Sequence, residues 1–279
     1  MEYITLNNGL KMPMIGIGTY PLNGISLIKA IVNAYKSGYT NFETSAAYFN
    51  EECLGVSLEL IKSLGAKEIF VTTKLSNTAQ REGDARKALL NSMKKLGVAQ
   101  VDLYLMHWPY PEKYLDSWKQ MEALYNEGLV KAIGVCNFHE HHLDKLLEVA
   151  EIVPAVNQIE IHPLFSQKPL RNYCENRGIK LQAYSPVARM NPKLIENELL
   201  VALAAKYQKT VPQIILRWDI QSGLLTVPKS GNRKRIQENI DIFDFELTQE
   251  EMYKIEHINE DYRIRFNPDT VDYVNVLKA

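Results

Sequence analysis

The sequence has no excess of charge and no long apolar run. Its 279 residues include 32 basic and 33 acidic side chains, a formal net charge of -1, without a long block of like charge. Nucleic-acid or membrane-surface binding is therefore not expected. No stretch approaches the ~20 apolar residues of a membrane span, and the N-terminus MEYITLNNGLKMPM is too polar for a signal peptide. We expect a cytoplasmic protein.

Cysteine is scarce, and linker-like segments are absent. Cys53, Cys136 and Cys174 are widely separated and odd in number, so they indicate neither a disulfide framework nor a metal knuckle. Reduced thiols agree with a cytoplasmic location. Without a composition shift, a Pro/Gly/Ser-rich linker or a low-complexity segment, residues 1–279 are predicted to form one domain.

Short β-branched runs alternate with amphipathic stretches along the chain. Apolar runs such as IFVTTK and DLYLMH lack in/out alternation, as strands buried on both faces of a parallel sheet do. Eight such units predict a (β/α)8 TIM-type barrel, with a doubly wound α/β sheet as the alternative. We expect strands at 15–18, 39–43, 69–74, 101–106, 130–135, 155–159, 179–184 and 224–226, and helices at 25–35, 51–63, 81–96, 113–127, 141–150, 169–176, 196–221 and 232–239.

Two further elements are expected outside the eightfold pattern. The segments 3–6 and 10–12 flank an Asn-Gly turn, which predicts an N-terminal β-hairpin covering one end of the barrel. Near residues 248–258, Thr248 followed three residues later by Glu251 predicts an extra C-terminal helix that begins with a capping box.

Polar side chains end six of the expected strands, where a barrel places its ligand-facing residues. Lys74 would be buried and need a partner, for which Glu43 on the neighbouring strand is the simplest candidate. Tyr48 follows the Glu43 strand and is a candidate general acid; Lys74 is expected to lower its pKa. Each residue alone is more often structural, and only the set indicates a site. The strand-end residues are Glu43, Lys74, His107, Asn137, Gln158, Tyr184 and Ser185.

A basic segment, KSGNRKR, precedes the helix expected at 232–239. Backbone amides at a helix N-terminus together with Arg and Lys side chains form an anion site, although the segment read alone is more simply a solvated basic turn.

These motifs resemble those of the aldo-keto reductase family in order and spacing, over essentially the whole chain. The resemblance rests on GYTNFETSAAYFNEECLG, IFVTTK, VDLYLMHWP, GVCNF, VNQIEIHP, AYSP and VPKSGNRKRIQENIDIFDF. It implies NADPH-dependent reduction of a small aldehyde or ketone to an alcohol in the barrel mouth, by a monomer.

The resemblance also implies individual roles. Tyr48 would protonate the carbonyl oxygen, Lys74 would lower the pKa of Tyr48, and His107 would orient the carbonyl, with Glu43 completing the catalytic set. The implied cofactor residues are Gly18, Thr19 and Tyr20 under the cofactor, Cys136 and Ser185 in its motifs, Asn137 and Gln158 at the carboxamide, Tyr184 stacked on the nicotinamide, Lys229, Ser230 and Arg235 at the 2'-phosphate, and Glu238 and Asn239 at the adenine.

Two positions depart from the family pattern: Glu43 stands where the family has aspartate, and Cys136 where it commonly has serine. If the longer side chain of Glu43 prevents catalysis, the chain is an NADPH-binding barrel with little turnover. A third alternative is a lyase or aldolase that uses Lys74 as a Schiff base, in which KSGNRKR has no part.

The substrate wall and the histidine cluster complete the expectations. Trp108, Phe49 and Tyr110 would form an apolar wall with Tyr20, favouring aromatic or hydrophobic carbonyls, and the short loops after AYSP and Arg265 predict a permissive pocket. The histidines of HEHH at 139–142 resemble metal ligands. We nevertheless expect a solvated helix start and no metal, because no carboxylate or cysteine set completes the ligands.

Overall fold

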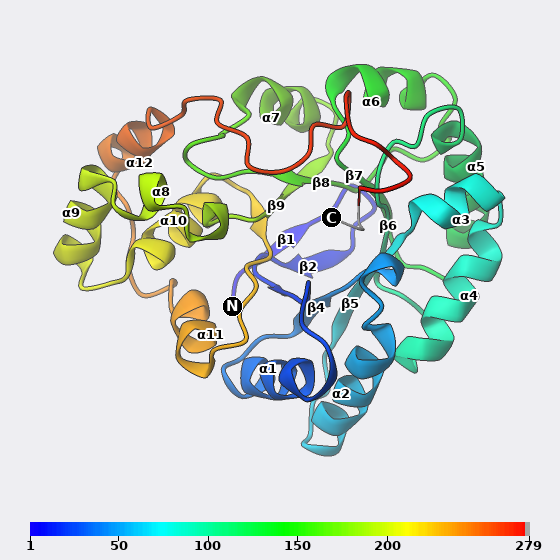
Figure 1. Cartoon of the computed structure of the whole chain (residues 1–279), viewed down its shortest axis with the longest axis horizontal. Helices are drawn as coiled ribbons and strands as arrows, with labels where there is room; N and C mark the ends of the chain where they lie inside the picture. Colours follow the sequence, from blue (N-terminus) through cyan, green and yellow to red (C-terminus); the bar gives the residue numbers. More distant parts are fainter. Residues whose placement is uncertain (277–279) are drawn as a thin grey trace.

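The computed structural model describes residues 1–276 and shows an eight-stranded parallel sheet rolled into a barrel (Figure 1). Consecutive strands are neighbours throughout. The sheet closes where the Gly16 amide donates to the Thr226 carbonyl at 2.9 Å and the Thr226 amide donates to the Met14 carbonyl at 2.8 Å. The barrel strands are β3 (Ile17–Gly18), β4 (Asn41–Glu43), β5 (Phe70–Leu75), β6 (Leu103–Met106), β7 (Ile133–Cys136), β8 (Val156–Glu160), β9 (Lys180–Tyr184) and β10 (Leu225–Thr226).

Helices form the outer layer around the barrel (Figure 1). The predicted (β/α)8 architecture is thereby confirmed over a doubly wound sheet. The helices are α1 (Gly24–Lys36), α2 (Glu51–Ser63), α3 (Asn77–Glu82), α4 (Ala85–Leu96), α5 (Tyr114–Asn126), α6 (Glu140–Leu147), α7 (Lys168–Glu175), α8 (Pro192–Ile195), α9 (Glu198–Tyr207), α10 (Val211–Gln221), α11 (Arg233–Ile240) and α12 (Gln249–Glu256), with short 3-10 turns η1 (Ala46–Tyr48) and η2 (Ala188–Met190).

Two expected helices are divided in the structure, so those boundaries were wrong. The segment 81–96 breaks at Gly83, which has a left-handed φ of 73°, and α4 begins after the Asp84 N-cap. The segment 196–221 breaks at Gln208, where φ is 55°, and α10 starts afresh behind the capping box of Thr210. In both places the helical spacing of apolar residues continues past the end of one helix and the N-cap of the next. Periodicity alone therefore predicts one helix where the structure has two.

The N-terminal hairpin covers the N-terminal end of the barrel, as predicted. It pairs β1 (Tyr3–Thr5) with β2 (Lys11–Pro13) in antiparallel register. The Asn7 side chain donates to the Pro154 carbonyl at 3.1 Å and the Asn8 side chain donates to the Lys131 carbonyl at 2.9 Å. Those carbonyls precede β8 and β7, so the opposite, C-terminal end remains for a ligand site. Figure 1 shows the hairpin across the barrel axis.

The C-terminal helix α12 also follows the prediction. Thr248 accepts from the Glu251 amide at 3.2 Å, and the Glu251 carboxylate accepts from the Thr248 amide at 2.8 Å. None of the helices within residues 1–276 has the length and apolar character needed to cross a membrane. The domain predicted over 1–279 includes residues 277–279, which lie outside the described part.

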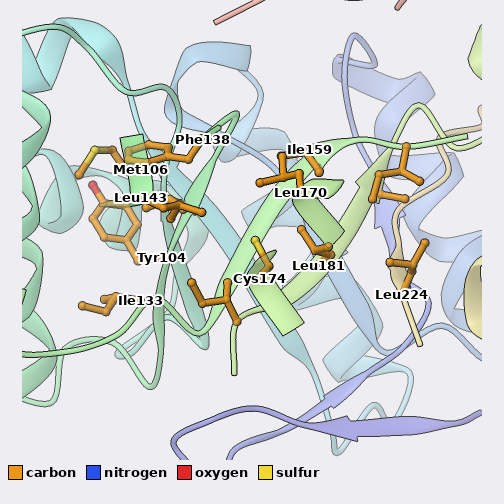
Figure 2. Close-up of a cluster of buried hydrophobic side chains, with 14 of the residues drawn as sticks. Tyr104, Met106, Ile133, Phe138, Leu143, Ile159, Leu170, Cys174, Leu181 and Leu224 are labelled. Carbon is orange, nitrogen blue, oxygen red and sulfur yellow. The ribbon is translucent and has the colours of Figure 1, made fainter. Parts of the chain in front are cut away.

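A hydrophobic layer, divided into two clusters, packs between the strands and the outer helices. Figure 2 shows part of it, where side chains of β6 to β9 meet Leu143 of α6 and Leu170 and Cys174 of α7. Leu143 and Cys174 are fully buried. Full burial of a side chain such as Leu143 contributes about 1.5–3 kcal/mol. The packing holds α6 and its N-terminal histidines at the barrel mouth.

Candidate active site

A cavity of about 760 Å³ opens at the C-terminal end of the barrel. Its wall contains Glu43, Tyr48, His107 and Trp108, and every residue that the sequence predicted to contact the cofactor. The latter are Gly18, Thr19, Tyr20, Cys136, Asn137, Gln158, Tyr184, Ser185, Lys229, Ser230, Arg235, Glu238 and Asn239. Lys74 lies behind this wall, fully buried on β5.

Lys74 forms the ion pair that the sequence predicted with Glu43. Strands β4 and β5 pair in parallel with Glu43 opposite Thr72, and Lys74 is two residues further on the same face. The Lys74 ammonium donates to Glu43 Oε1, to the Thr44 carbonyl at 3.1 Å and to the Tyr48 hydroxyl at 3.4 Å. All three donors of the ammonium are therefore used.

The pKa of Tyr48 is raised overall, although Lys74 lowers it as the sequence predicted. Burial of the phenol raises the pKa and outweighs the opposing effect of the Lys74 cation. Burial also opposes the charge of Lys74, but Glu43, with smaller contributions from Tyr48 and Cys136, outweighs it, and the pKa of Lys74 is raised. At pH 7 the phenol therefore keeps its proton and the lysine is a cation.

The second oxygen of Glu43 reaches across the barrel to Gln158. Gln158 donates to Glu43 Oε2 at 3.3 Å and to Gln182 Oε1 at 2.7 Å. Gln182 is fully buried and was not identified from the sequence. The sequence did contain a pattern that could have identified Gln182. It precedes Tyr184 by two residues, and residues two apart in a strand lie on the same face of β9. Glu43 thus connects the lysine to a predicted carboxamide-binding residue.

His107 is held as a neutral imidazole beside Tyr48. Burial and the Lys74 cation lower its pKa well below the usual value. Its Nδ1 shares a hydrogen bond of 3.0 Å with the Ser45 hydroxyl, and its ring packs edge-on against the Tyr48 ring at 5.6 Å. A neutral imidazole retains one N–H donor with which to orient a carbonyl.

Asn137 lies at the end of β7 in a left-handed conformation, with φ of 65°. Its amide nitrogen donates to the His107 carbonyl at 3.0 Å, and its oxygen accepts from the Tyr184 hydroxyl at 2.7 Å. Cys136 beside it is buried, and burial raises the pKa of its thiol. Cys136 is therefore a buried thiol, not a reactive one.

Cations gather at the α11 end of the cavity without carboxylate partners. Lys229, Arg235 and Arg189 all line the wall, and within residues 1–276 none of the three forms an ion pair. Burial and the nearby Arg235 and Arg189 lower the pKa of Lys229. Asn232 caps α11 by accepting from the Arg235 amide at 3.1 Å. Crowded, unpaired cations at a helix N-terminus form an anion site.

Two arginines of the wall were missed by the sequence reasoning. Arg189 lies in η2 with φ of 54°. Arg265 comes from the C-terminal tail, whose backbone is fixed because Glu160 accepts from the amides of Ile264 at 2.7 Å and Arg265 at 3.0 Å. No local pattern connects these residues with the strand ends. The other lining residues not predicted are Pro21, Pro186, Val187, Met190, Thr210, Pro212, Val227, Pro228 and Gly231.

Two residues of the expected apolar wall lie outside the cavity lining. Phe49 ends η1 in a left-handed conformation and is 84% exposed. Tyr110 packs its ring against Tyr273 of the C-terminal tail at 5.6 Å. Trp108 lines the cavity as expected, and its ring also packs against Tyr273, with 6.3 Å between the ring centroids. The tail, red in Figure 1, runs along the barrel mouth, where Tyr273 contacts both Trp108 and Tyr110.

The histidine cluster begins a helix, as expected, but one premise of that expectation was wrong. α6 starts at Glu140 behind the His139 N-cap. A carboxylate does complete the set, because Asp269 of the tail lies against the three histidines.

The side chains of the cavity combine a phenol, a buried cation and an anion site. A protonated phenol beside a buried cation is a proton donor whose anion is stabilised. The unpaired cations at α11 line the same cavity, so a phosphate-bearing molecule bound to them would lie in the cavity that also contains Tyr48. The fold and the site together are those of a barrel enzyme with a proton-donating phenol and an anion-binding end in one cavity.

The chain belongs to the Aldo/keto reductase family, whose model matches residues 14–260. It is 45% identical over 269 residues to the glyoxal reductase of Bacillus subtilis (strain 168), covering 96% of each chain. It is 41% identical over 268 residues to the methylglyoxal reductase DkgA of Escherichia coli (strain K12), covering 95% of this chain and 96% of that one. The NADP complex of a Bombyx mori aldo-keto reductase superposes with a TM-score of 0.87 at 37% identity, covering 96% of both chains.

Proposed function

We propose that this protein reduces small aldehydes or ketones to alcohols with NADPH, and that Tyr48 donates the proton. Membership of the family supports carbonyl reduction. The observation that carries the specific proposal is the Tyr48 hydroxyl, which faces the cavity and accepts from the buried Lys74 at 3.4 Å.

The cavity fits NADPH by the chemistry of its wall. The unpaired Lys229 and Arg235 at the N-terminus of α11 match the 2'-phosphate, with Ser230 in the same turn. Asn137 and Gln158 offer amide groups to the carboxamide, and Tyr184 offers a ring to the nicotinamide. When bound, NADPH supplies the hydride.

The remaining steps belong to the protein. His107 donates a hydrogen bond to the carbonyl oxygen and orients it, and Tyr48 donates its proton to the same oxygen as charge develops there. The phenolate that Tyr48 becomes is stabilised by the Lys74 cation, which Glu43 keeps charged and in place.

The substrate class that we propose is small dicarbonyl compounds. Relatives of this chain are named for the reduction of glyoxal and methylglyoxal. Phe49 and Tyr110 lie outside the cavity lining, so fewer aromatic side chains line the mouth than we expected from the sequence. The preference for aromatic or hydrophobic carbonyls that we expected from the sequence stays a prediction, and the assay described below compares both kinds of substrate.

Replacing Arg235 tests the assignment of the cofactor. Arg235→Ala is expected to weaken NADPH binding about 10- to 100-fold, because a hydrogen bond to a charged group contributes about 1.5–3 kcal/mol. NADH lacks the 2'-phosphate and serves as the matched ligand, whose affinity is expected to change little. The measurement is quenching of intrinsic fluorescence by each cofactor. An equal loss of affinity for both cofactors would remove Arg235 from the 2'-phosphate.

Replacing Glu43 separates the reductase from its main alternative, a barrel that binds NADPH with little turnover. Because Glu43 pairs directly with Lys74, we expect wild type to turn over. We expect Glu43→Asp to change kcat by less than ~10-fold, below the ~100-fold that a misplaced group can cost. The measurement is NADPH oxidation with methylglyoxal and with an aromatic aldehyde. Activity in Glu43→Asp alone would establish the alternative.

The Schiff-base alternative is disfavoured by the same ion pair. A lysine attacks a carbonyl as the neutral amine, whereas Glu43 keeps Lys74 protonated. Trapping of a substrate adduct on Lys74 by borohydride would reverse this conclusion.

We further propose that the chain acts as one barrel domain and a monomer in the cytoplasm. The free thiols of Cys53, Cys136 and Cys174 support a reducing compartment. Sedimentation equilibrium of the protein tests the oligomeric state.

A further inference from the structure

Three histidines and a carboxylate converge where the C-terminal tail meets α6. His139, His141 and His142 stand at the start of α6, and Asp269 reaches them from the tail. Asp269 Oδ2 lies 2.9 Å from His139 Nδ1, and its Oδ1 lies 3.2 Å from His141 Nε2 and 3.8 Å from His142 Nε2. One ligand atom from each residue lies within 4.8 Å of every other.

The distances from Asp269 to the three histidines are near those between the ligands of a tetrahedral metal site. Bonds of about 2.0–2.1 Å to nitrogen and oxygen place tetrahedral ligands ~3.3 Å apart, and the distances from Asp269 bracket that value. Imidazole with one carboxylate suits Zn²⁺ and its transition-metal neighbours, whereas Mg²⁺ and Ca²⁺ take oxygen ligands.

We propose that His139, His141, His142 and Asp269 form a binding site for one divalent transition-metal ion, and that Zn²⁺ is the ion this donor set fits. The site lies outside the cofactor cavity, and nothing in the proposed reduction uses it. It connects a surface helix to a tail segment 130 residues away in the sequence.

Two hydrogen bonds of the histidine rings must break when the ion binds. His142 Nδ1 accepts from the His139 amide at 3.2 Å, and His139 Nε2 lies 3.1 Å from an Arg263 nitrogen. Both bonds require an unprotonated nitrogen, but the ring nitrogen opposite a metal normally carries a proton. His141 and Asp269 have no such conflict, so we expect them to capture the ion first. Arg263 and the positive end of α6 oppose a cation, and for this reason the site depends on the Asp269 charge.

Metal binding would fix the tail at the barrel mouth. Between Arg263 and Tyr273 the tail supplies Arg265 to the cavity wall and packs Tyr273 against Trp108, which also lines the cavity. Asp269 lies in the middle of this segment. An ion shared with α6 therefore restrains both contacts at once, since α6 is held to the core by its buried leucines.

The first test is zinc binding by the untagged full-length protein after dialysis against a chelator. Titration calorimetry with ZnCl₂ is expected to show one site per chain, weakened at least ~10-fold in His141→Ala and in Asp269→Asn. His141 is more than half exposed, so its replacement leaves no core cavity. His257→Ala is the matched control, because that exposed histidine follows α12, lies outside the cluster and is expected to leave binding unchanged. Equal zinc affinity in wild type and His141→Ala, or no binding, would overturn the proposal.

The second test follows the tail by amide hydrogen exchange. At saturating Zn²⁺ we expect slower exchange in residues 263–273 of wild type and no slowing in Asp269→Asn. Unchanged exchange in the wild-type tail would place the ion elsewhere and overturn the site. Without zinc, Co²⁺ offers an independent readout, since four-coordinate nitrogen and oxygen ligation gives intense visible absorption that octahedral aqueous Co²⁺ lacks.

Discussion

Tyr48→Phe is expected to lower kcat/KM for methylglyoxal reduction at least ~100-fold, because general acid catalysis contributes about 10²–10⁴-fold. The variant removes only the hydroxyl. The ring keeps its contacts with Tyr20 at 4.9 Å and His107 at 5.6 Å, and NADPH affinity should therefore change by no more than ~2-fold. The measurements are NADPH oxidation in the steady state and fluorescence titration of the cofactor.

Tyr20→Phe is the matched control for that experiment. Tyr20 lines the same cavity beside Tyr48, but the Lys74 ammonium donates to the hydroxyl of Tyr48. We expect the control to keep its rate within a few-fold of wild type. Activity that survives in Tyr48→Phe would transfer the proton donation to another group, for which the neutral His107 is the nearest candidate.

The barrel and the proposed catalytic set could be predicted from local sequence patterns. Eight buried apolar runs with intervening amphipathic stretches identify the strands, and a parallel barrel brings all their C-terminal ends to one face. Glu43, Lys74, His107 and Gln158 end such strands. The structure accordingly places Glu43, His107 and Gln158 in the wall of one cavity and Lys74 directly behind Glu43. Residues at strand ends are predictable because the topology fixes their position without knowledge of side-chain packing.

Residues supplied by loops and by the tail were not predictable in this way. Arg265 lines the cavity, where the backbone of the tail is held by Glu160. Tyr110 lies outside the cavity lining and packs its ring against Tyr273. Asp269 completes the histidine cluster from the same segment. The position of the tail depends on contacts between residues more than 100 positions apart, as for Arg265 and Glu160 at a separation of 105, which no local periodicity records.

The pKa of Tyr48 shows a second limit of reasoning from sequence. Lys74 lowers the pKa of the phenol, as the pairing of residue types predicts, but the burial that raises it is a property of the completed fold. The direction consequently depends on how deep the site lies. For a reductase the observed direction is favourable, because a donor must hold its proton until the carbonyl oxygen develops charge.

Lys74→Met is expected to destabilise the fold and abolish reduction together. Lys74 is fully buried, and its removal leaves the Glu43 carboxylate buried without its cation, which costs about 3–5 kcal/mol in the free energy of unfolding. Loss of the cation that stabilises the Tyr48 phenolate should lower kcat at least ~100-fold. Urea unfolding and NADPH oxidation measure the two effects.

A double variant separates the two consequences of losing Lys74. When Lys74→Met is combined with Glu43→Gln the pocket holds no unpaired charge, and the amide introduced in place of the Glu43 carboxylate can still bond to Gln158. Because replacing a buried ion pair by neutral groups is often close to neutral for stability, most of the lost free energy of unfolding should return. Reduction should not return, since the phenolate of Tyr48 still lacks a cation. A double variant as active as wild type would show that the pair serves folding alone, and that Tyr48 donates its proton without help from Lys74.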